Sequence, residues 1–292
     1  MIVKATYFQN NKEHPLVYGD VELINPKRRR LRGEEEKEGV LAESALVGFC
    51  GTDNTLMHMG EAGLLTPKFP DGTNRLINGH EGVVWVPGEQ RFAIVLIRGG
   101  DSFDPTRYTE DETYFEYGCD RADGLFSDRN YYNHDMLLTI PSPEANRPKL
   151  PLSLAKKLVF ADPYACMIFQ RERMEDLGEA HNFRVVMARR GCDEAQARAP
   201  ARKETFRRVC IFGLGTTGMF LGDLIRRKYP DAQIVFVARS DADSPKVKFA
   251  LEQTGARYVR SDYASNAELA SAIIEALGGR ATSFVGVSGS AV

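Results

Sequence analysis

Two short stretches of the sequence contain residue types that could bind a catalytic metal. The first holds the thiol of Cys50, the hydroxyl of Thr52 and the carboxylate of Asp53. The second, further along the chain, adds the imidazole of His80 and the carboxylate of Glu81. A soft thiolate, an imidazole and carboxylate oxygens, with one position open for substrate, form the donor set of a catalytic zinc site.

A purely structural explanation of these residues has to be weighed against the metal site. A single cysteine is commonly a small buried apolar residue, and the compact ligand spacings of structural zinc sites are absent here. Two features favour the metal site. Glycines flank both stretches, which lets the backbone pass close to a bound group, and a dinucleotide fingerprint follows later in the chain.

The composition excludes several classes of protein. A length of 292 residues, 43% hydrophobic and 27% charged, predicts a globular protein with one large domain or two ordinary ones. A net charge of -2 argues against general nucleic-acid binding, and neither a membrane span nor a secretory signal is visible. Five scattered cysteines indicate a reducing compartment, so we expect a cytoplasmic protein with no nucleic-acid or membrane partner.

The first third of the chain predicts β structure. Residues 2–98 contain many short apolar segments separated by Gly, Pro and Asp, which is typical of a barrel-like domain. Residues 27–38 predict a solvated charged loop, residues 54–63 a short helix and residues 99–132 an extended surface loop. Strands are expected to resume at residues 124–127 and 136–141.

The apolar spacing becomes helical from Leu154 onward. Asp162 followed by Pro163 suits an N-cap and the first turn of a helix, which we expect to run to about Leu177. Beyond a connecting segment, the chain alternates short apolar strands with helices. This alternation predicts a parallel sheet with right-handed crossovers over the last part of the chain.

A glycine-rich turn follows the first strand of that sheet and opens a helix. Gly213 would make the tight turn, Gly215 would let the backbone approach a pyrophosphate, and Gly218 would let the helix pack on the strand. Thr216 and Thr217 lie at the start of this helix, whose amide groups would bind the phosphates. The strand–turn–helix order is the context that a dinucleotide site requires.

The end of the next strand bears on the identity of the dinucleotide. A carboxylate there would bind the ribose of NAD, whereas this chain has Arg239 and Ser240, which can pair with a 2′-phosphate. These residues favour NADP. In the alternative interpretation, Arg239 points into solvent and Asp241 or Asp243 reaches the ribose.

Taken together, these motifs give the chain a resemblance to the zinc-dependent medium-chain dehydrogenase/reductase family of alcohol and polyol dehydrogenases. Within it, the chain is most similar to the glucose dehydrogenase-like branch. The resemblance implies an α/β fold, with a GroES-like β-barrel catalytic domain at residues 1–180 and a Rossmann domain at 181–292. The family continues beyond the end of this sequence, so the Rossmann sheet is expected to be only partly complete, truncated after its fourth strand.

The resemblance also implies roles for the candidate residues. Cys50 and His80 would bind zinc directly, Glu81 would be a direct or exchangeable ligand, and Asp53 would hold His80 in place. Asp162 stands where the sugar-oxidising branch carries a glutamate, and its side chain is one methylene shorter. The four cysteines that bind a structural zinc in many relatives are missing, because Cys119 is the only cysteine in that region. One catalytic zinc and no structural zinc are therefore expected.

The implied activity is hydride transfer between NADP and a sugar, polyol or other secondary alcohol, with Thr52 relaying the hydroxyl proton. Two rival interpretations remain open at this point. The first is a zinc-free NADPH-dependent reductase of the same fold, and the second is a nucleotide-binding protein without turnover. A homo-oligomer is possible, while the substrate, the direction of reaction and the oligomeric state are not specified by the sequence.

Overall fold

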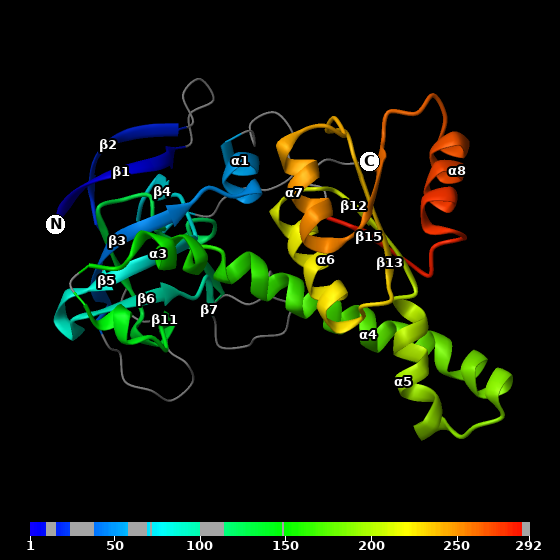
Figure 1. The fold of residues 1–292 in the computed structure, drawn as a ribbon. Helices are drawn as coiled ribbons and strands as arrows, with labels where there is room; N and C mark the ends of the chain where they lie inside the picture. Colours follow the sequence, from blue (N-terminus) through cyan, green and yellow to red (C-terminus); the bar gives the residue numbers. More distant parts are fainter. Residues whose placement is uncertain are drawn as a thin grey trace. The chain divides into compact units, whose positions relative to one another are not determined.

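The computed structural model describes residues 1–9, 16–23, 38–57, 69–70, 72–99, 114–147 and 149–287. The chain divides into two compact units, Met1–Asp162 and Pro163–Val292 (Figure 1). The boundary expected near residue 180 falls inside the long helix α4 (Ala161–Arg190), which begins at the junction of the units. Within the described part of the chain, no helix is long and apolar enough to cross a membrane.

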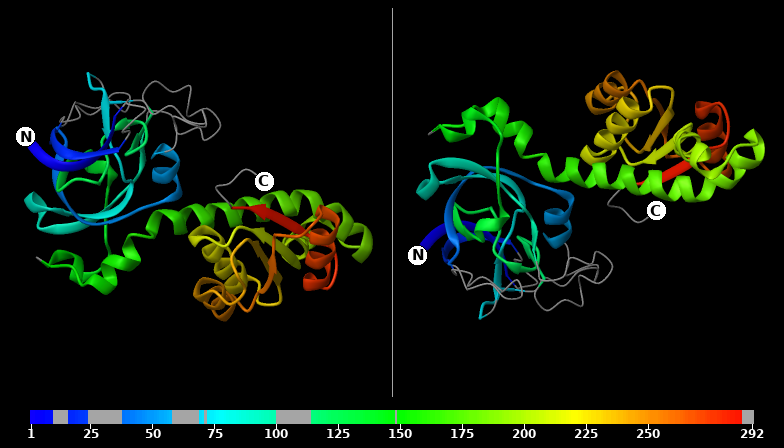
Figure 2. Two further views of the ribbon diagram at one scale, coloured as in Figure 1. Left: turned by 90° about the horizontal axis from the view of Figure 1, so that it is seen from above. Right: turned by 90° about the horizontal axis from the view of Figure 1, so that it is seen from below.

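The first unit consists mainly of antiparallel strands. Strands β1 (Ile2–Gln9), β2 (Leu16–Glu22) and β4 (Arg75–Ile77) form one sheet in the order β2-β1-β4. A five-stranded sheet has the order β10-β3-β5-β6-β11. Its strands are β3 (Val40–Gly48), β5 (Glu81–Val86), β6 (Arg91–Val95), β10 (Arg129–Tyr132) and β11 (Leu137–Thr139). Figure 2 shows these strands curving around one another rather than lying in one plane.

The five-stranded sheet is covered on both faces. Along β5, Val84 packs into one apolar cluster together with Ala93 of β6, whereas Val83 packs into another together with Phe92. Since successive side chains of a strand point to opposite faces, both faces of the sheet are apolar. The second cluster is completed by helix α3 (Leu152–Leu158) and the 3₁₀ turn η3 (Pro143–Asn146).

A small sheet lies near the candidate metal residues. It is formed by β7 (Arg98–Gly99), β8 (Phe115–Tyr117) and β9 (Arg121–Ala122). Helix α1 (Gly51–Met57) follows β3, and 3₁₀ turns η1 (Pro87–Glu89) and η2 (His134–Met136) connect other strands. The expected strand at residues 124–127 is wrong. This segment is a bend whose backbone amides donate hydrogen bonds to the carbonyls of residues 77–79, at and just after the end of β4. Ser127 forms an isolated β-bridge with Ala5.

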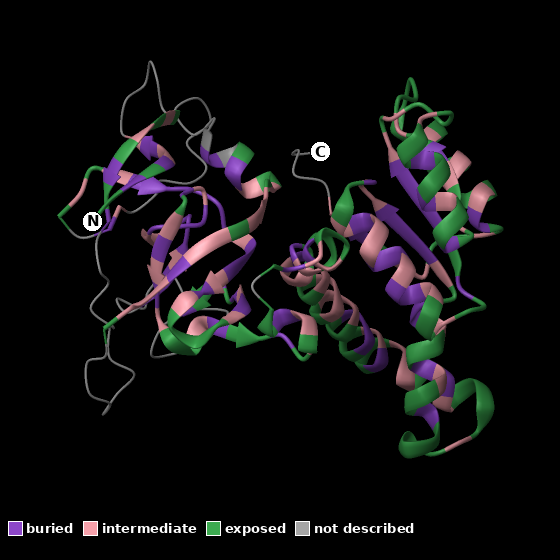
Figure 3. Cartoon of the chain, turned by 60° about the vertical axis from the view of Figure 1, so that its left-hand side comes forward, coloured by how far each residue is buried: buried purple, intermediate pink, exposed green. Residues whose placement is uncertain are grey.

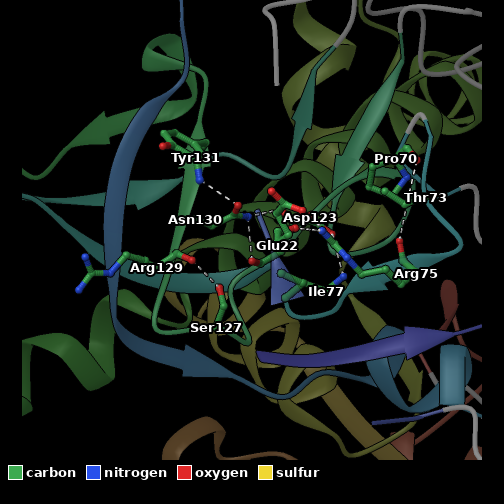
Figure 4. A network of polar contacts seen from close by, with 11 residues as sticks. Glu22, Pro70, Thr73, Arg75, Ile77, Asp123, Ser127, Arg129, Asn130 and Tyr131 are labelled. Atoms are coloured by element: carbon green, nitrogen blue, oxygen red, sulfur yellow. Dashed lines mark hydrogen bonds and ion pairs between the residues drawn. The ribbon is translucent and has the colours of Figure 1, made fainter. Parts of the chain in front are cut away.

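A buried ion pair anchors β4 beside that bend (Figure 4). The Asp123 carboxylate accepts hydrogen bonds from the Arg75 guanidinium and from the backbone amide of Ile77. On the other side, the Asn130 amide donates to the carbonyls of Asp123 and Gly124. Burial raises the pKa of Asp123, while Arg75 and the Ile77 amide act to lower it. These contacts determine where β4 ends and the His80 segment begins.

The second unit contains a four-stranded parallel sheet in the order β14-β13-β12-β15. Its strands are β12 (Arg208–Phe212), β13 (Gln233–Ala238), β14 (Arg257–Arg260) and β15 (Ser283–Gly286). Helices α6 (Thr216–Lys228), α7 (Pro245–Thr254) and α8 (Asn266–Leu277) connect these strands. Residues 288–292 lie outside the described part of the chain.

Alternating residues of the parallel sheet face different helices. On one face, Ile211 and Phe236 pack with Leu221 of α6 and Val247 of α7. On the other face, Cys210, Val235 and Val237 pack with α8. The middles of β12 and β13 are accordingly buried. Figure 3 shows strands coloured as buried between helices with exposed faces. The prediction of an α/β fold with a parallel nucleotide-type sheet is confirmed, whereas closure of the first unit into a barrel stays a prediction.

Helix α4 is longer than expected and begins earlier. It starts at Ala161, so Asp162 lies within its first turn instead of capping it, because the turn after α3 already leads the chain into helical geometry. Its Met174 packs beneath the parallel sheet. Glu179 pairs with Arg198 and Arg202 of α5 (Glu194–Thr205), so the expected connecting segment is largely helical. Of the other expectations, nearly all of the loop at 27–38 and most of the helix at 54–63 lie outside the described residues. The extended surface loop expected at 99–132 is wrong over its described part, residues 114–132, which contains β8, β9 and β10 and buries Tyr117 and Leu125. Its aromatic side chains pack into the interior instead of facing solvent.

Candidate metal and nucleotide sites

Strand pairing brings the two candidate metal-binding stretches together. Strand β3 ends at Gly48 just before Cys50, and β5 begins at Glu81 just after His80. The strands pair antiparallel with Gly48 opposite Glu81, so the chain segments that carry the thiol and the imidazole leave the sheet side by side. A long-range β pairing therefore supplies the proximity that the sequence motifs require.

Asp53 ties the two segments to each other through their backbones. One oxygen of its buried carboxylate accepts from the Cys50 amide at 3.0 Å, and the other accepts from the Gly79 amide at 3.1 Å. The resemblance assigns Asp53 to His80 itself, whereas the structure shows it bonded to the amide of Cys50 and to the amide that precedes His80. Asp53 thus sets the separation between the two loops.

Cys50 and His80 are in direct contact. The Cys50 sulfur lies 3.1 Å from Nε2 of His80 and accepts a hydrogen bond from the Thr52 amide at 3.2 Å. One donor atom from each of Cys50, Asp53 and His80 lies within 4.8 Å of the others. Burial raises the pKa of the Cys50 thiol to about 12, with further contributions from the negative charges of Asp53 and Glu81. A bound cation would oppose all of these effects.

Glu81 and Asp162 are close enough to influence each other electrostatically but do not join that compact set. Burial raises the pKa of Glu81 to about 7, and the charges of Asp162 and Asp53 add to the effect. Within the described residues, no basic side chain lowers the pKa of Glu81. A thiol, an imidazole and carboxylates that raise the pKa values of their neighbours form a donor set that fits a divalent zinc ion.

Cys119 lies on the opposite side of the same imidazole, and the sequence analysis did not identify this contact. Its sulfur is 3.2 Å from Nδ1 of His80, and donor atoms of His80, Cys119 and Glu116 lie within 4.8 Å of one another. Burial and the neighbouring charge of Glu116 raise the pKa of the Cys119 thiol. The one local sequence feature that could have indicated this contact is Gly118, which precedes Cys119 as Gly79 precedes His80.

Three glycines let the segments around His80 pack backbone to backbone. A Cβ on Gly118 or Gly124 would lie 2.5 Å or 2.1 Å from the Gly79 carbonyl oxygen. Gly79 itself has φ +86°, and a Cβ there would meet the Phe126 ring at 2.8 Å. Only glycine fits these positions without displacing neighbouring atoms. The close approach of Gly118 to Gly79 is what places Cys119 next to His80.

The predicted nucleotide fingerprint has the geometry expected of a strand–turn–helix site. Gly213 has φ +110°, and its amide donates to the Val237 carbonyl at 2.9 Å. A Cβ on Gly218 would lie 2.1 Å from the Gly213 carbonyl oxygen, so glycine is required for helix α6 to pack on the turn. A Cβ on Gly215 would meet no atom within 4 Å. Gly215 therefore leaves open space in front of the helix.

The start of α6 has no side-chain cap. Gly215 occupies the N-cap position, so the amides of the first turn, which Thr216 and Thr217 begin, receive no hydrogen bond from a capping side chain. Uncapped amides at a helix N-terminus, together with the helix dipole, favour an anionic ligand. The open space at Gly215 and these amides lie at the same end of the helix.

Arg239 and Ser240 follow β13 directly, at the strand end where the fingerprint also lies. Arg239 is exposed, and the backbone carbonyl of Ser240 accepts from the Tyr258 hydroxyl at 2.6 Å. The acidic residues of the alternative interpretation are already paired. Asp241 lies 2.7 Å from Arg260, and Asp243 lies 3.4 Å from Lys248.

Comparisons of structure identify dehydrogenases, whereas comparisons of sequence find no relative. No protein-family model and no curated protein matches the sequence. The glucose dehydrogenase of Haloferax mediterranei, solved with NADP, zinc and gluconolactone, aligns with a TM-score of 0.56 at 18% identity. That alignment covers 99% of this chain and 85% of the other.

Two further solved structures extend the same pattern. The 2R,3R-butanediol dehydrogenase of Bacillus subtilis aligns with a TM-score of 0.59 at 17% identity, over 98% of this chain and 71% of that one. An alcohol dehydrogenase of Escherichia coli CFT073, solved with NADH, has a TM-score of 0.59 at 15% identity, over 98% and 69%. At these identities the likeness shows the fold: this chain has the fold of zinc-dependent medium-chain alcohol, polyol and glucose dehydrogenases.

Proposed function

We propose that this protein is a zinc-dependent oxidoreductase that transfers hydride between NADP and a sugar, polyol or other secondary alcohol. The observation that carries the proposal is the contact between the Cys50 sulfur and the His80 ring beside the carboxylates of Asp53 and Glu81. Burial raises the pKa of this thiol most, and the charges of those carboxylates add to the effect. The fold neighbours support it, because those proteins are dehydrogenases of alcohols, polyols and sugars.

Cys50 and His80 would hold the metal, with Glu81 or Asp162 completing the set. When bound, zinc supplies a Lewis acid that lowers the pKa of a substrate hydroxyl. Asp53 keeps its place on the two backbone amides and so maintains the spacing of the ligands. Thr52, two residues after Cys50 in the first turn of α1 and half-buried, would carry the substrate proton toward solvent.

The second unit would bind NADP through its exposed helix end and the residues after β13. The amides beginning at Thr216 and Thr217 would bind the pyrophosphate, with Gly213, Gly215 and Gly218 shaping the turn. Arg239 would pair with the 2′-phosphate, and Ser240 would add a hydrogen bond. NADP is favoured over NAD because the exposed Arg239, and not a carboxylate, directly follows β13.

Metal analysis and cofactor titration of the purified protein test the proposal. We expect about one zinc per chain and tighter binding of NADPH than of NADH. Oxidation of sugars and polyols should depend on NADP, and Cys50→Ser should lose both metal and turnover. Cys192→Ser, which alters a cysteine of the second unit, is the matched control and should keep both.

Two results would contradict the proposal. Wild-type turnover by metal-free protein would favour a zinc-free NADPH-dependent reductase. Stoichiometric zinc and tight NADPH binding without turnover of any alcohol or carbonyl substrate would favour a nucleotide-binding protein.

A further inference from the structure

The exposed Arg239 follows a strand end that is held by hydrogen bonds from both sides. On the β12 side, the Gly213 amide donates to the Val237 carbonyl at 2.9 Å. On the β14 side, the Ser261 amide donates to the Ala238 carbonyl at 2.9 Å. The backbone that leads into Arg239 is therefore fixed relative to the glycine turn, where the pyrophosphate of a dinucleotide would bind.

Tyr258 of β14 extends this support past the end of β13. Its hydroxyl lies 2.9 Å from the carbonyl oxygen of Ala238 and 2.6 Å from that of Ser240. These two residues come directly before and after Arg239. A hydroxyl carries one proton, and the Ala238 carbonyl already accepts from the Ser261 amide, so we assign that proton to the shorter contact with Ser240.

The alternation of side chains along β14 explains why Tyr258 reaches this segment. Tyr258 lies opposite Phe236 of β13 and packs with the apolar cluster on the face that α6 and α7 cover. The next residue, Val259, belongs to the cluster on the face that α8 covers. The half-buried ring of Tyr258 is thus held by packing, while its hydroxyl meets the chain where it leaves β13 toward α7.

A second side chain of β14, Arg260, also contacts this segment but constrains it less. Its guanidinium lies 2.7 Å from Asp241 and 2.9 Å from Asp262, and all three side chains are about half exposed or more. Exposed ion pairs contribute little, because water screens the charges and flexible side chains have to be ordered. The hydroxyl of Tyr258, on a packed ring and bonded to backbone, is the stronger constraint on Arg239.

We propose that Tyr258 is a positioning residue for cofactor selection, which holds the backbone on both sides of Arg239 and so presents its guanidinium to the 2′-phosphate of NADP. This inference rests on the proposed function, in which Arg239 pairs with that phosphate. Because the Tyr258 hydroxyl is bonded to backbone carbonyls, it acts through Arg239. NADH has a hydroxyl in place of the phosphate, so its binding should not depend on Tyr258.

Fluorescence titration of the full chain with NADPH and with NADH tests the proposal without requiring turnover. Tyr258→Phe removes the hydroxyl and keeps the ring. We expect the dissociation constant of NADPH to rise about 5- to 10-fold, as for one lost hydrogen bond, and that of NADH to change less than about 2-fold. Tyr229→Phe, at the other end of α6, is the matched control and should change neither.

A double-mutant cycle separates positioning from a general structural role. Arg239→Gln should remove most of the preference for NADPH, because the partner of the 2′-phosphate is lost. Adding Tyr258→Phe to Arg239→Gln should weaken NADPH binding no further, since the hydroxyl acts through the guanidinium. Arg260→Gln should change the dissociation constant of NADPH less than about 2-fold.

Several outcomes of these titrations would overturn the proposal. Unchanged NADPH binding in Tyr258→Phe would show that the hydroxyl does not position Arg239. Equal losses for NADPH and NADH would show a merely structural role. Additive losses in the double variant would show that Tyr258 acts independently of Arg239, and loss of the NADPH preference in Arg260→Gln would make Arg260 the phosphate partner.

Failure of the proposed function can be told apart from failure of this inference. If wild type preferred NADPH but oxidised no alcohol, the dehydrogenase activity would be wrong while the double-mutant cycle still decided the role of Tyr258. If wild type bound NADH as tightly as NADPH, the assignment of NADP and the role of Tyr258 would both be wrong.

Discussion

The two candidate sites are assembled in different ways. In the second unit, one continuous segment, residues 213–218, follows a strand and shapes the turn in front of α6. In the first unit, three segments that are distant in sequence, around Cys50, His80 and Cys119, meet around one imidazole. A site built from one segment is specified by local geometry, whereas a site built from three depends on how the sheets pair and where glycines allow close contact.

The electrostatics of the two sites are opposite as well. In the first site, burial raises the pKa values of Cys50 and Glu81 and the charges of nearby carboxylates add to the effect, which suits a cation. The second presents uncapped amides and an exposed arginine, which suits an anion. The pair of sites is thus complementary to a metal ion and to a phosphorylated cofactor.

The largest expected effect tests whether the buried ion pair between Arg75 and Asp123 stabilises the first unit, which carries the candidate metal site. Arg75→Met should destabilise the first unit by about 3–5 kcal/mol, because it leaves the buried Asp123 carboxylate unpaired. Burial raises the folded-state pKa of Asp123, and losing Arg75 raises it further, so the deficit should be greatest at high pH and shrink as the pH falls. Urea unfolding followed by fluorescence of Trp85, the single tryptophan of the chain, reports this unit.

Arg129→Met is the matched control for the anchor. Arg129 pairs with Glu43 at 3.5 Å with both side chains more than 40% exposed, so its loss should cost about 0–1 kcal/mol. Equal losses in the two variants would show that the buried pair does not hold the first unit together.

An intermediate effect separates the packing and binding roles of two glycines in the second unit. Gly218→Ala should destabilise this unit by about 1–3 kcal/mol, because its Cβ would collide with the Gly213 carbonyl. Gly215→Ala should change stability by about 0.5 kcal/mol or less, since its Cβ meets nothing, and yet it should weaken NADPH binding. Thermal unfolding by circular dichroism and fluorescence titration with NADPH measure the two quantities. Unchanged NADPH affinity in Gly215→Ala would place the pyrophosphate elsewhere.

The smallest expected effect concerns the charge at Glu81. Its folded-state pKa of about 7 lies above the ordinary value of 4.5, so the ionised carboxyl disfavours the folded state above pH 7, and this penalty disappears as the pH falls through 4.5. Because the side chain is partly exposed, we expect only about 1 kcal/mol. Glu81→Gln should remove this part of the pH dependence in metal-free protein, and bound zinc should reduce it in wild type. If the metal-free variant and metal-free wild type had identical stability–pH profiles, Glu81 would not have a raised pKa in the folded state.

The sequence predicts the second unit more completely than the first. The residues of β12, the turn at 213–218 and the start of α6 are adjacent in the chain, so their order alone indicates a nucleotide-type site. The sequence predicts that the long helix begins at Pro163, after Asp162, whereas α4 begins at Ala161. The spacing of apolar residues does not show that the turn after α3 leads directly into α4. The cytoplasmic location, the homo-oligomer and the domain boundary at residue 180 stay predictions.

The sequence by itself determined the types of donor atom and the alternation of strands and helices, because thiols, imidazoles, glycines and apolar periodicity are local properties of the chain. Only the tertiary structure decided that Asp53 bonds to the Cys50 and Gly79 amides and that Cys119 lies against His80. These contacts join segments that no local pattern relates. They arise because paired strands and facing glycines bring separate backbones within hydrogen-bonding distance.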